Sequence, residues 1–368
     1  MRKLAKGIRM RATSRGATLL GPDKIEIREY PLPEVMPDGA LVAVEMAGVC
    51  GTDVKYLHGK RQQMPLPIIL GHEILGRVVK LGAEAASIHG LKEGDRIILK
   101  GAKGCGACVH CRRGAARFCK KRTSYGGKTT CANPPHLFGG FADYIYLAPD
   151  VLVTKVRDDL PAEAAVLIGA VMANGFQWAV RHGGLKMGDY ILIQGPGQQG
   201  LACTFAAHAT GAARIFVTGM GKDNKRLEMA RRFGAHRTID VEKENVPQVV
   251  REETEGAMAD VVVDVSGSPQ AIRTSVECVR EQGTMVLAGL TGDATLTPML
   301  MDMFVRKEIR LQGTFTADND ATEVAMRVIE ATKFPVQDMV SHTFTIEETE
   351  HCIRAVGGEI PDFIRSKP

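Results

Sequence analysis

Apolar and polar positions alternate over short stretches in the first part of the chain, and turn residues separate these stretches. Residues 25–29 alternate, and after three prolines residues 40–45 form an extended run. Glycines then flank further short apolar runs at 76–82 and 94–99, and residues 139–147 return to the same pattern. Short strands separated by glycine and proline are typical of antiparallel sheets. The pattern predicts an irregular β-barrel domain in this part of the chain.

The pattern changes near Pro161, where strands begin to alternate with helices. Residues 162–173 are alanine-rich and helical in pattern, and residues 190–194 form a continuous apolar run. Such a run is expected of a parallel strand that is buried on both faces. Further strands are predicted at 214–218, 259–265 and 284–287. This alternation predicts a doubly wound α/β domain.

The end of the chain and its composition complete the outline of a two-domain α/β protein. After residue 313 we expect a helix at 322–332, a strand at 342–346 and a helix at 347–356. A chain of 368 residues is long enough for two domains, and it contains no run of 18 apolar residues. The basic N-terminus, residues 1–11, lacks the apolar run of a secretory signal. We therefore expect neither membrane insertion nor secretion.

Charge and cysteine usage narrow the surroundings of the protein. The net charge of +5 is small and scattered over the chain, so we expect no nucleic-acid partner. Four of the nine cysteines are clustered, and the other five are spread singly. An odd count with a clustered set favours a reducing compartment, and hence a cytoplasmic protein, over a disulfide framework.

The clustered cysteines follow the spacing C-x2-C-x2-C-x7-C, at Cys105, Cys108, Cys111 and Cys119. Thiolates are soft ligands, and four of them close a tetrahedral zinc site at about 2.3 Å from the metal. Such a site leaves no open position, so it predicts a structural zinc. Four unrelated buried cysteines and an iron–sulfur cluster are the alternatives, although the usual cluster spacings differ from this one.

A glycine-rich turn, Gly195 to Gly200, directly follows the strand predicted at 190–194 and opens a helical run at 201–210. In this context G-x-G-x-x-G is a dinucleotide fingerprint, because the glycines allow close backbone approach and the pyrophosphate lies on the helix N-terminus. A glycine turn without a ligand is the alternative. The candidate cofactor contacts in and after this motif are Gly195, Gly197, Gln198, Gln199, Gly200, Ser266 and Gly289.

The strand after the fingerprint ends at Gly219, where an acid would normally take the hydroxyls of the adenosine ribose. The missing acid, together with Lys222, Lys225 and Arg226, marginally favours NADP over NAD. Asp223 could reach the ribose instead, and these basic side chains could equally form a solvated helix face.

A second group of candidate residues lies in the barrel domain. Gly48-Val49-Cys50-Gly51-Thr52-Asp53 and Gly71-His72-Glu73 place a thiol, an imidazole and a carboxylate within 24 residues. Cysteine and histidine with an open position suit a catalytic zinc, which acts as a Lewis acid on an alcohol or carbonyl oxygen. Taken singly, each of these residues has an ordinary structural interpretation.

Together, these motifs resemble those of the zinc-dependent medium-chain alcohol dehydrogenases, over about residues 16 to 360. The resemblance rests on the two motifs above, Gly-Asp-Arg at 94–96, the four cysteines, the glycine fingerprint and Val-Ser-Gly at 265–267. It implies a GroES-like catalytic domain from residues 1–172 and 314–368, which carries the structural-zinc loop 104–119. It also implies a Rossmann domain at 173–313, one structural and one catalytic zinc, and hydride transfer between NAD(P) and an alcohol carbon in the interdomain cleft. Relatives form homodimers and homotetramers.

The resemblance assigns roles to individual residues and leaves one position unmatched. Cys50 and His72 match the first two zinc ligands, and Glu73 matches the acid beside the metal. Ala170 falls where the third ligand is expected, and alanine cannot bind zinc. Either Glu73 becomes the third ligand, or the site holds metal weakly or not at all.

Two further residues match positions that handle the proton. Thr52 matches the hydroxyl that hydrogen-bonds the substrate oxygen. Lys55 falls where many relatives have a proton-relay histidine, and it is either a relay with a lowered pKa or a solvated lysine.

We therefore expect a zinc-dependent alcohol dehydrogenase or ketone reductase acting on a primary or secondary alcohol, including cyclic alcohols and polyols. Lys55, Lys60 and Arg61 favour an anionic or polyhydroxylated substrate. An apolar pocket is equally favoured by Met64, Leu66, Leu137, Phe138 and Phe176. The alternatives are a reductase of the same fold without catalytic zinc, and a non-catalytic nucleotide-binding protein.

Overall fold

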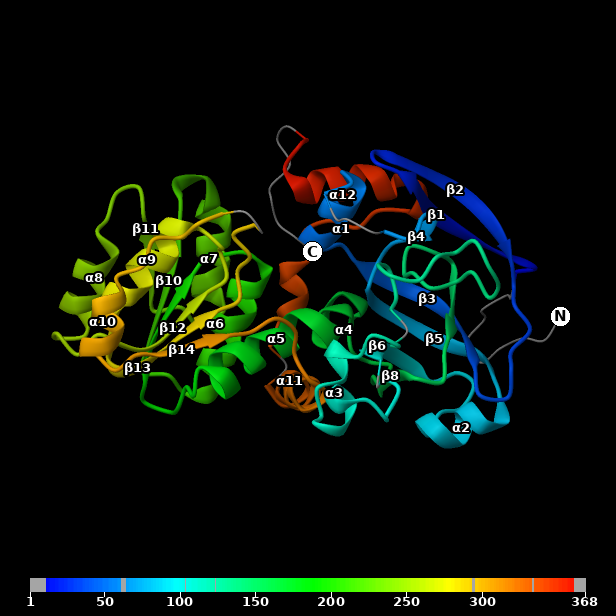
Figure 1. Ribbon diagram of the computed structural model, residues 1–368, viewed down its shortest axis with the longest axis horizontal. Helices are drawn as coiled ribbons and strands as arrows, with labels where there is room; N and C mark the ends of the chain where they lie inside the picture. The colour runs from blue at the N-terminus through cyan, green and yellow to red at the C-terminus, as the bar shows by residue number, and fades with distance from the viewer. Residues whose placement is uncertain are drawn as a thin grey trace. The chain divides into compact units, whose positions relative to one another are not determined.

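A computed structural model describes residues 11–60, 64–102, 104–122, 124–292, 295–332 and 334–360 (Figure 1). Arg61 and nearly all of the basic N-terminus lie outside these residues. The chain forms two compact units, one up to Gly169 and again from Pro335, the other from Ala170 to Phe334.

The second border lies later in the chain than the border expected at 313/314. Helix α11 (Asn319–Thr332) packs against α5 (Ala173–Gly175) of the second unit. The backbone N–H of Ala317 donates to Oδ1 of Asn174 at 2.8 Å, and Ala173, Ala317 and Ala321 share a small buried cluster. These contacts hold the segment before Pro335 to the second unit.

The first unit is built on two antiparallel sheets. The larger has the order β7-β3-β5-β6-β8, and the smaller has the order β2-β1-β4. The larger sheet comprises β3 (Ala40–Gly48), β5 (Glu73–Leu81), β6 (Arg96–Ala102), β7 (Tyr144–Leu147) and β8 (Val151–Lys155). The smaller comprises β1 (Thr13–Gly21), β2 (Lys24–Pro31) and β4 (Ile68–Ile69). The curled antiparallel sheets confirm the expected irregular barrel of GroES-like type.

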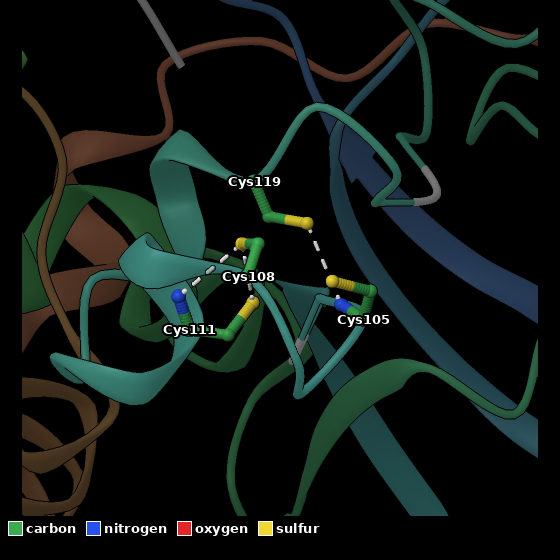
Figure 2. A group of neighbouring side chains, drawn as sticks. All are labelled: Cys105, Cys108, Cys111 and Cys119. Carbon is green, nitrogen blue, oxygen red and sulfur yellow. Dashed lines mark hydrogen bonds between the residues drawn. The ribbon is translucent and has the colours of Figure 1, made fainter.

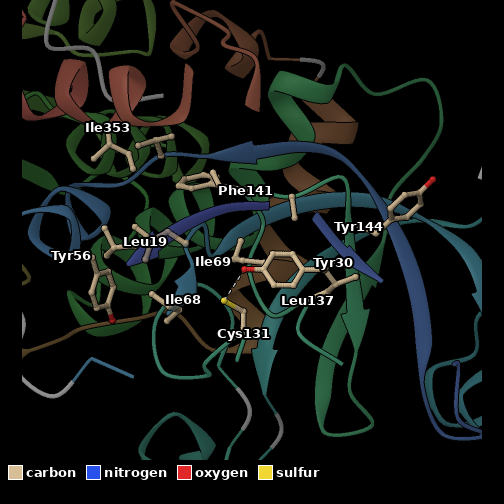
Figure 3. Close-up of a cluster of buried hydrophobic side chains, with 14 of the residues drawn as sticks. Leu19, Tyr30, Tyr56, Ile68, Ile69, Cys131, Leu137, Phe141, Tyr144 and Ile353 are labelled. Carbon is tan, nitrogen blue, oxygen red and sulfur yellow. Dashed lines mark hydrogen bonds between the residues drawn. The ribbon is translucent and has the colours of Figure 1, made fainter. Parts of the chain in front are cut away.

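Among the described residues of this unit, the α-helices are α1 (Gly51–Leu57), α2 (Ala83–His89), α3 (Val109–Arg112), α4 (Ala162–Leu167) and α12 (Thr349–Gly357). Helix α12 packs against α1, and its Ile353 belongs to the same buried cluster as Leu19, Ile68 and Phe141 (Figure 3). Within this cluster the hydroxyl of Tyr30 lies 2.7 Å from Oγ1 of Thr18 and 3.3 Å from Sγ of Cys131. Burial raises the pKa of Tyr30 to about 12, so the phenol stays neutral.

The strand expected at 342–346 is wrong. Residues 341–345 form neither helix nor strand, and a 3₁₀ turn (Ile346–Glu348) follows and leads into α12. The reason is a capping box: Oε2 of Glu348 accepts from the backbone N–H of Thr345 at 2.8 Å and from its hydroxyl at 3.0 Å. The threonine that read as a strand residue is the N-terminal cap of the following helical segment.

The second unit is a doubly wound sheet of six parallel strands in the order β11-β10-β9-β12-β13-β14. The strands are β9 (Tyr190–Gln194), β10 (Arg214–Gly219), β11 (Arg237–Asp240), β12 (Ala259–Asp264), β13 (Val279–Leu287) and β14 (Arg310–Gly313). The helices between them are α6 (Gln198–Thr210), α7 (Asn224–Arg232), α8 (Val246–Glu253), α9 (Pro269–Cys278) and α10 (Met301–Arg306). The middle positions of β9, β10 and β12 are apolar and buried, as expected of parallel strands that are covered on both faces, which confirms the predicted α/β unit.

One continuous helical stretch, Ala162–His182, is long and apolar enough to cross a membrane by length and composition. It contains π-helical turns at Ile168–Met172 and Phe176–His182. Buried positions make up 83% of its most apolar window, which is the behaviour of a core helix. No other helix in the described ranges meets these criteria.

A buried arginine ties the larger sheet of the first unit to the segment before α4. Arg96 is 4% exposed; it donates to both carboxylate oxygens of Glu45, at 2.9 and 2.7 Å, and to the carbonyls of Arg157 and Leu160. We expect Arg96→Ala to lower the free energy of unfolding by about 3 kcal/mol, because Glu45 and two carbonyls lose their donor. Arg157→Ala removes an exposed pair with Asp159 and should cost about 0–1 kcal/mol. Urea denaturation of both variants measures this, and equal losses would contradict the role given to Arg96.

Candidate functional site

The first candidate site arises from the register between β3 and β5. These strands are antiparallel, and Gly48 at the end of β3 pairs with Glu73 at the start of β5. Cys50 follows β3 and His72 precedes β5, so the pairing brings the thiol, the imidazole and the carboxylate together. Their ligand atoms all lie within 4.8 Å of one another.

Two glycines make this approach possible. A Cβ at Gly48 would lie 2.3 Å from Oε2 of Glu73, where the carboxylate now sits. Gly71 has φ +87°, and a Cβ there would lie 2.7 Å from the ring of Phe141. The glycine that opens each motif, Gly48 or Gly71, is therefore a steric requirement of the site.

Asp53, which the sequence analysis did not assign, links the two halves of the site. Cys50 is the N-cap of α1, and its backbone N–H donates to Oδ2 of Asp53 at 2.8 Å. The other oxygen of this fully buried carboxylate lies 3.6 Å from Nδ1 of His72. The spacing of an N-cap and an acid three residues later was the available signal.

The environment of His72 fixes the orientation of its ring. Burial disfavours the imidazolium, but the carboxylate of Asp53 and the thiol of Cys50 outweigh this and raise the pKa of His72 well above its usual value. With Nδ1 facing Asp53, Nε2 is the nitrogen left for a metal. A carboxylate behind a histidine is the usual support of a metal-binding imidazole.

The remaining residues expected around this site are placed unequally. Oγ1 of Thr52 lies 3.8 Å from Sγ of Cys50, so Thr52 belongs to the group. Lys55 lies one turn further along α1 and is exposed. Ala170, at the position where a third ligand was expected, is the first residue of the second unit. In the described part of the chain, the candidate metal ligands at this site are Cys50, His72 and Glu73.

The four cysteines form the second candidate metal centre (Figure 2). Their sulfurs all lie within 4.8 Å of one another, and those of Cys108 and Cys111 are 3.5 Å apart. A tetrahedral zinc with bonds of about 2.3 Å requires sulfurs about 3.8 Å apart, so the donor set fits this ion. All nine cysteines lack a disulfide partner in this structure.

The local conformation and the lowered pKa of Cys105 both fit a cation at this centre. Gly104 has φ +76°, and a Cβ there would lie 2.6 Å from Sγ of Cys111. The backbone N–H groups of Cys108 and Ala107 lower the pKa of Cys105 to about 6. Burial and the neighbouring thiol of Cys108 raise the pKa of Cys111 to about 11. Four adjacent thiolates repel one another unless a cation neutralises them.

The candidate cofactor residues of the second unit gather at the carboxyl edge of its sheet. Gly195 follows β9 with φ +110°, and Gly197 is the N-cap of α6. A Cβ at Gly200 would lie 1.9 Å from the carbonyl oxygen of Gly195, so only glycine fits. The strand order reverses between β9 and β12, which is where doubly wound sheets bind nucleotides.

The two glutamines of the fingerprint differ in their surroundings. Gln198, the first residue of α6, is buried, and its Oε1 has no hydrogen-bond partner in the described part of the chain. Gln199 accepts a hydrogen bond from Nδ2 of Asn174 at 3.3 Å.

Residues after β12 and β13 meet this turn. A Cβ at Gly195 would lie 3.2 Å from Cβ of Ser266, and a Cβ at Gly289 would lie 2.1 Å from the backbone nitrogen of Gly267. Asp264 holds the loop by accepting from the hydroxyl of Ser266 at 2.6 Å and the N–H of Gly267 at 3.1 Å. The structure therefore brings Gly195, Ser266 and Gly289 to one edge.

The residues expected to choose between NAD and NADP lie after β10. Gly219 ends this strand, and Lys222 is exposed in the turn that follows. Asp223 accepts from the backbone N–H of Met220 at 3.2 Å and pairs with Arg226 at 3.1 Å.

Two protein-family models match the chain, one in each of its units. Residues 36–158 match the alcohol dehydrogenase GroES-like domain, and residues 200–331 match the zinc-binding dehydrogenase domain. The chain is 34% identical over 353 residues to a probable alcohol dehydrogenase of Mycobacterium tuberculosis, covering 95% of each chain.

Two further proteins are similar over nearly the whole chain. The D-arabitol-phosphate dehydrogenase of Enterococcus avium is 28% identical over 371 residues, which covers 100% of this chain and 99% of that protein. The crystal structure of an alcohol dehydrogenase from Thermotoga maritima has the same fold, with a TM-score of 0.87 at 24% identity over 94% of this chain and 97% of that one. The chain thus belongs to the zinc-type medium-chain alcohol dehydrogenase family of NAD(P)-dependent oxidoreductases.

Proposed function

We propose that the protein is a zinc-dependent dehydrogenase that interconverts a primary or secondary alcohol, polyols included, and its carbonyl compound. The observation that carries this proposal is the convergence of Cys50, His72 and Glu73, backed by the buried Asp53. A thiolate, an imidazole and a carboxylate suit zinc with a position left for substrate. When bound, zinc polarises the substrate oxygen, and the nicotinamide accepts or donates the hydride.

The chain's own groups divide the remaining work. Asp53 holds the ring of His72, and Glu73 supplies the carboxylate that replaces the ligand absent at Ala170. The hydroxyl of Thr52, beside Cys50, would accept the proton of the substrate oxygen while its own proton leaves by way of Lys55 to solvent. The fingerprint turn at Gly195, Gly197 and Gly200 binds the dinucleotide, with its pyrophosphate at the start of α6.

Several observations support a polyhydroxylated or anionic substrate. Lys55 and Lys60 are exposed at the end of α1, and a full-length relative is named for a polyol phosphate. Leu137 and Phe176, offered by the sequence for an apolar pocket, are buried. Activity on a panel of polyols, polyol phosphates and simple secondary alcohols with each cofactor tests this choice.

The proposal also includes a cellular compartment and an oligomeric state. We infer that the enzyme works in the cytoplasm, because nine free thiols suit a reducing compartment. We also infer a homodimer or homotetramer from the family resemblance, which light scattering measures.

A second candidate is a reductase of the same fold without catalytic zinc, which the alanine at position 170 favours. Metal analysis separates the two: two zinc ions per chain support the zinc-dependent enzyme, and one supports the reductase.

Cys50→Ser and Cys108→Ser test whether the two thiol sites have different tasks. Each should lose one zinc ion per chain. Cys50→Ser should lower kcat/KM by about a thousandfold, because a Lewis acid supplies several kcal/mol, and it should unfold at the normal temperature. Cys108→Ser should lower the unfolding temperature, because a closed zinc site stabilises the fold. Normal turnover in Cys50→Ser would sink the proposed mechanism.

Glu73→Gln tests the third ligand. An amide keeps the shape of the side chain but binds zinc far less well than a carboxylate, so one zinc ion per chain should be lost on dialysis. Glu84→Gln on α2 makes the same change at an exposed position and should keep both ions. Full zinc content in Glu73→Gln would mean that Glu73 is not a ligand.

Asp53→Asn tests the support behind His72. The asparagine oxygen can still cap α1, but the negative charge facing Nδ1 is lost, so zinc affinity should fall about 10–100-fold. Competition with a chelator measures this, with Asp159→Asn on an exposed pair as the control. Unchanged affinity would show that Asp53 only caps the helix.

A further inference from the structure

The end of β10 leaves little room for the acid that normally recognises the adenosine ribose. Gly219 is buried, and a Cβ at this position would lie 2.9 Å from Cγ of Pro196 and 3.0 Å from Cδ2 of Leu227. Pro196 is part of the glycine fingerprint, and Leu227 belongs to the buried face of α7. An aspartate or glutamate at 219 would crowd the ring of Pro196 and the end of Leu227, which disfavours an acid at this position and favours one from another segment.

The neighbouring strand provides one. β11 is parallel to β10, and Asp240 at its end pairs with Gly219. The pairing continues past the strands, because the backbone N–H of Val241 donates to the carbonyl of Gly219 at 2.9 Å. This extension places Glu242 beside the turn after β10, where its Oε2 accepts from the backbone N–H of Gly221 at 2.8 Å.

Three acids lie around this turn: Asp223, Asp240 and Glu242. Among the ion pairs of the described residues, Glu242 is the acid of these three that has no cation partner. Asp223 pairs with Arg226 at 3.1 Å, and Asp240 pairs with Lys243 at 3.0 Å. Lys243 also lowers the pKa of Asp240, so this carboxylate is ionised at neutral pH. Arg226, one of the cations that favoured NADP, is thus committed to Asp223. Lys222 and Lys225 are exposed and remain the groups that could attract a phosphate.

We propose that Glu242 performs the task of the missing acid at position 219 and makes the protein select NAD over NADP. The carboxylate of Glu242 accepts a hydrogen bond from the backbone N–H of Gly221 and can also accept from the ribose hydroxyls. The 2′-phosphate of NADP would instead be repelled by its negative charge. This inference rests on the proposed dinucleotide site, and it reverses the marginal preference for NADP that Gly219 and the lysines indicated.

Binding of the reduced cofactors, without any alcohol, tests the inference separately from catalysis. Fluorescence titration should show NADH binding at least about tenfold more tightly than NADPH. Glu242→Gln keeps an acceptor for the N–H of Gly221 but removes the charge, so the NADH-to-NADPH affinity ratio should fall about tenfold. Glu228→Gln, an exposed position on α7, makes the same change of charge and should leave the ratio unchanged.

Three results would overturn the proposal. The proposal fails if NADPH binds at least as tightly as NADH. If Lys222→Gln then loses its affinity for NADPH, the lysine selects the cofactor. An unchanged ratio in Glu242→Gln would remove Glu242 from cofactor selection even if NADH is preferred. If neither cofactor binds the folded wild type, the proposed nucleotide site itself fails, which is distinct from a wrong choice of cofactor.

Discussion

The antiparallel pairing of Gly48 with Glu73 is the constraint on which the candidate metal site depends. A shift of one residue in this register would turn Glu73 to the other face of the sheet and move His72 away from Cys50. The register is held by the buried residues of both strands and by Gly48, which leaves room for the carboxylate. The convergence of the three candidate ligands is therefore a consequence of ordinary strand pairing.

Helix α1, which follows β3, contributes a buried carboxylate to this site. Cys50 is both a metal-type ligand and the cap of α1, so the same short turn orients a thiol and points Asp53 inward. A fully buried carboxylate is costly unless charged or polar partners surround it. Asp53 has the backbone of Cys50 on one side and the ring of His72 on the other.

Steric exclusion governs the nucleotide unit in the same way that register governs the metal site. The fingerprint requires glycine at 195 and 200 because backbone atoms approach closely. Its proline then narrows the space at the end of β10, which favours glycine at the end of that strand. The next parallel strand carries acids past that point, at Asp240 and Glu242. The composition of one turn thus favours the neighbouring strand as the source of acids beyond the end of β10.

Local patterns in the sequence were sufficient for the elements and for the two metal motifs. The apolar run at β9, the glycine turn after it and the cysteine spacing act over a few residues, so they predict structure without knowledge of neighbours. The strand expected at 342–346 failed because a capping box and an alternating strand share the same residue types.

Contacts between distant segments were decided only by the tertiary structure. Asp53 faces His72, and Glu242 faces Gly221, because strand pairing brings segments about 20 residues apart side by side. The border of the second unit depends on the packing of α11 against α5. Pairing register and packing are properties of two segments at once, and no single stretch of sequence contains them.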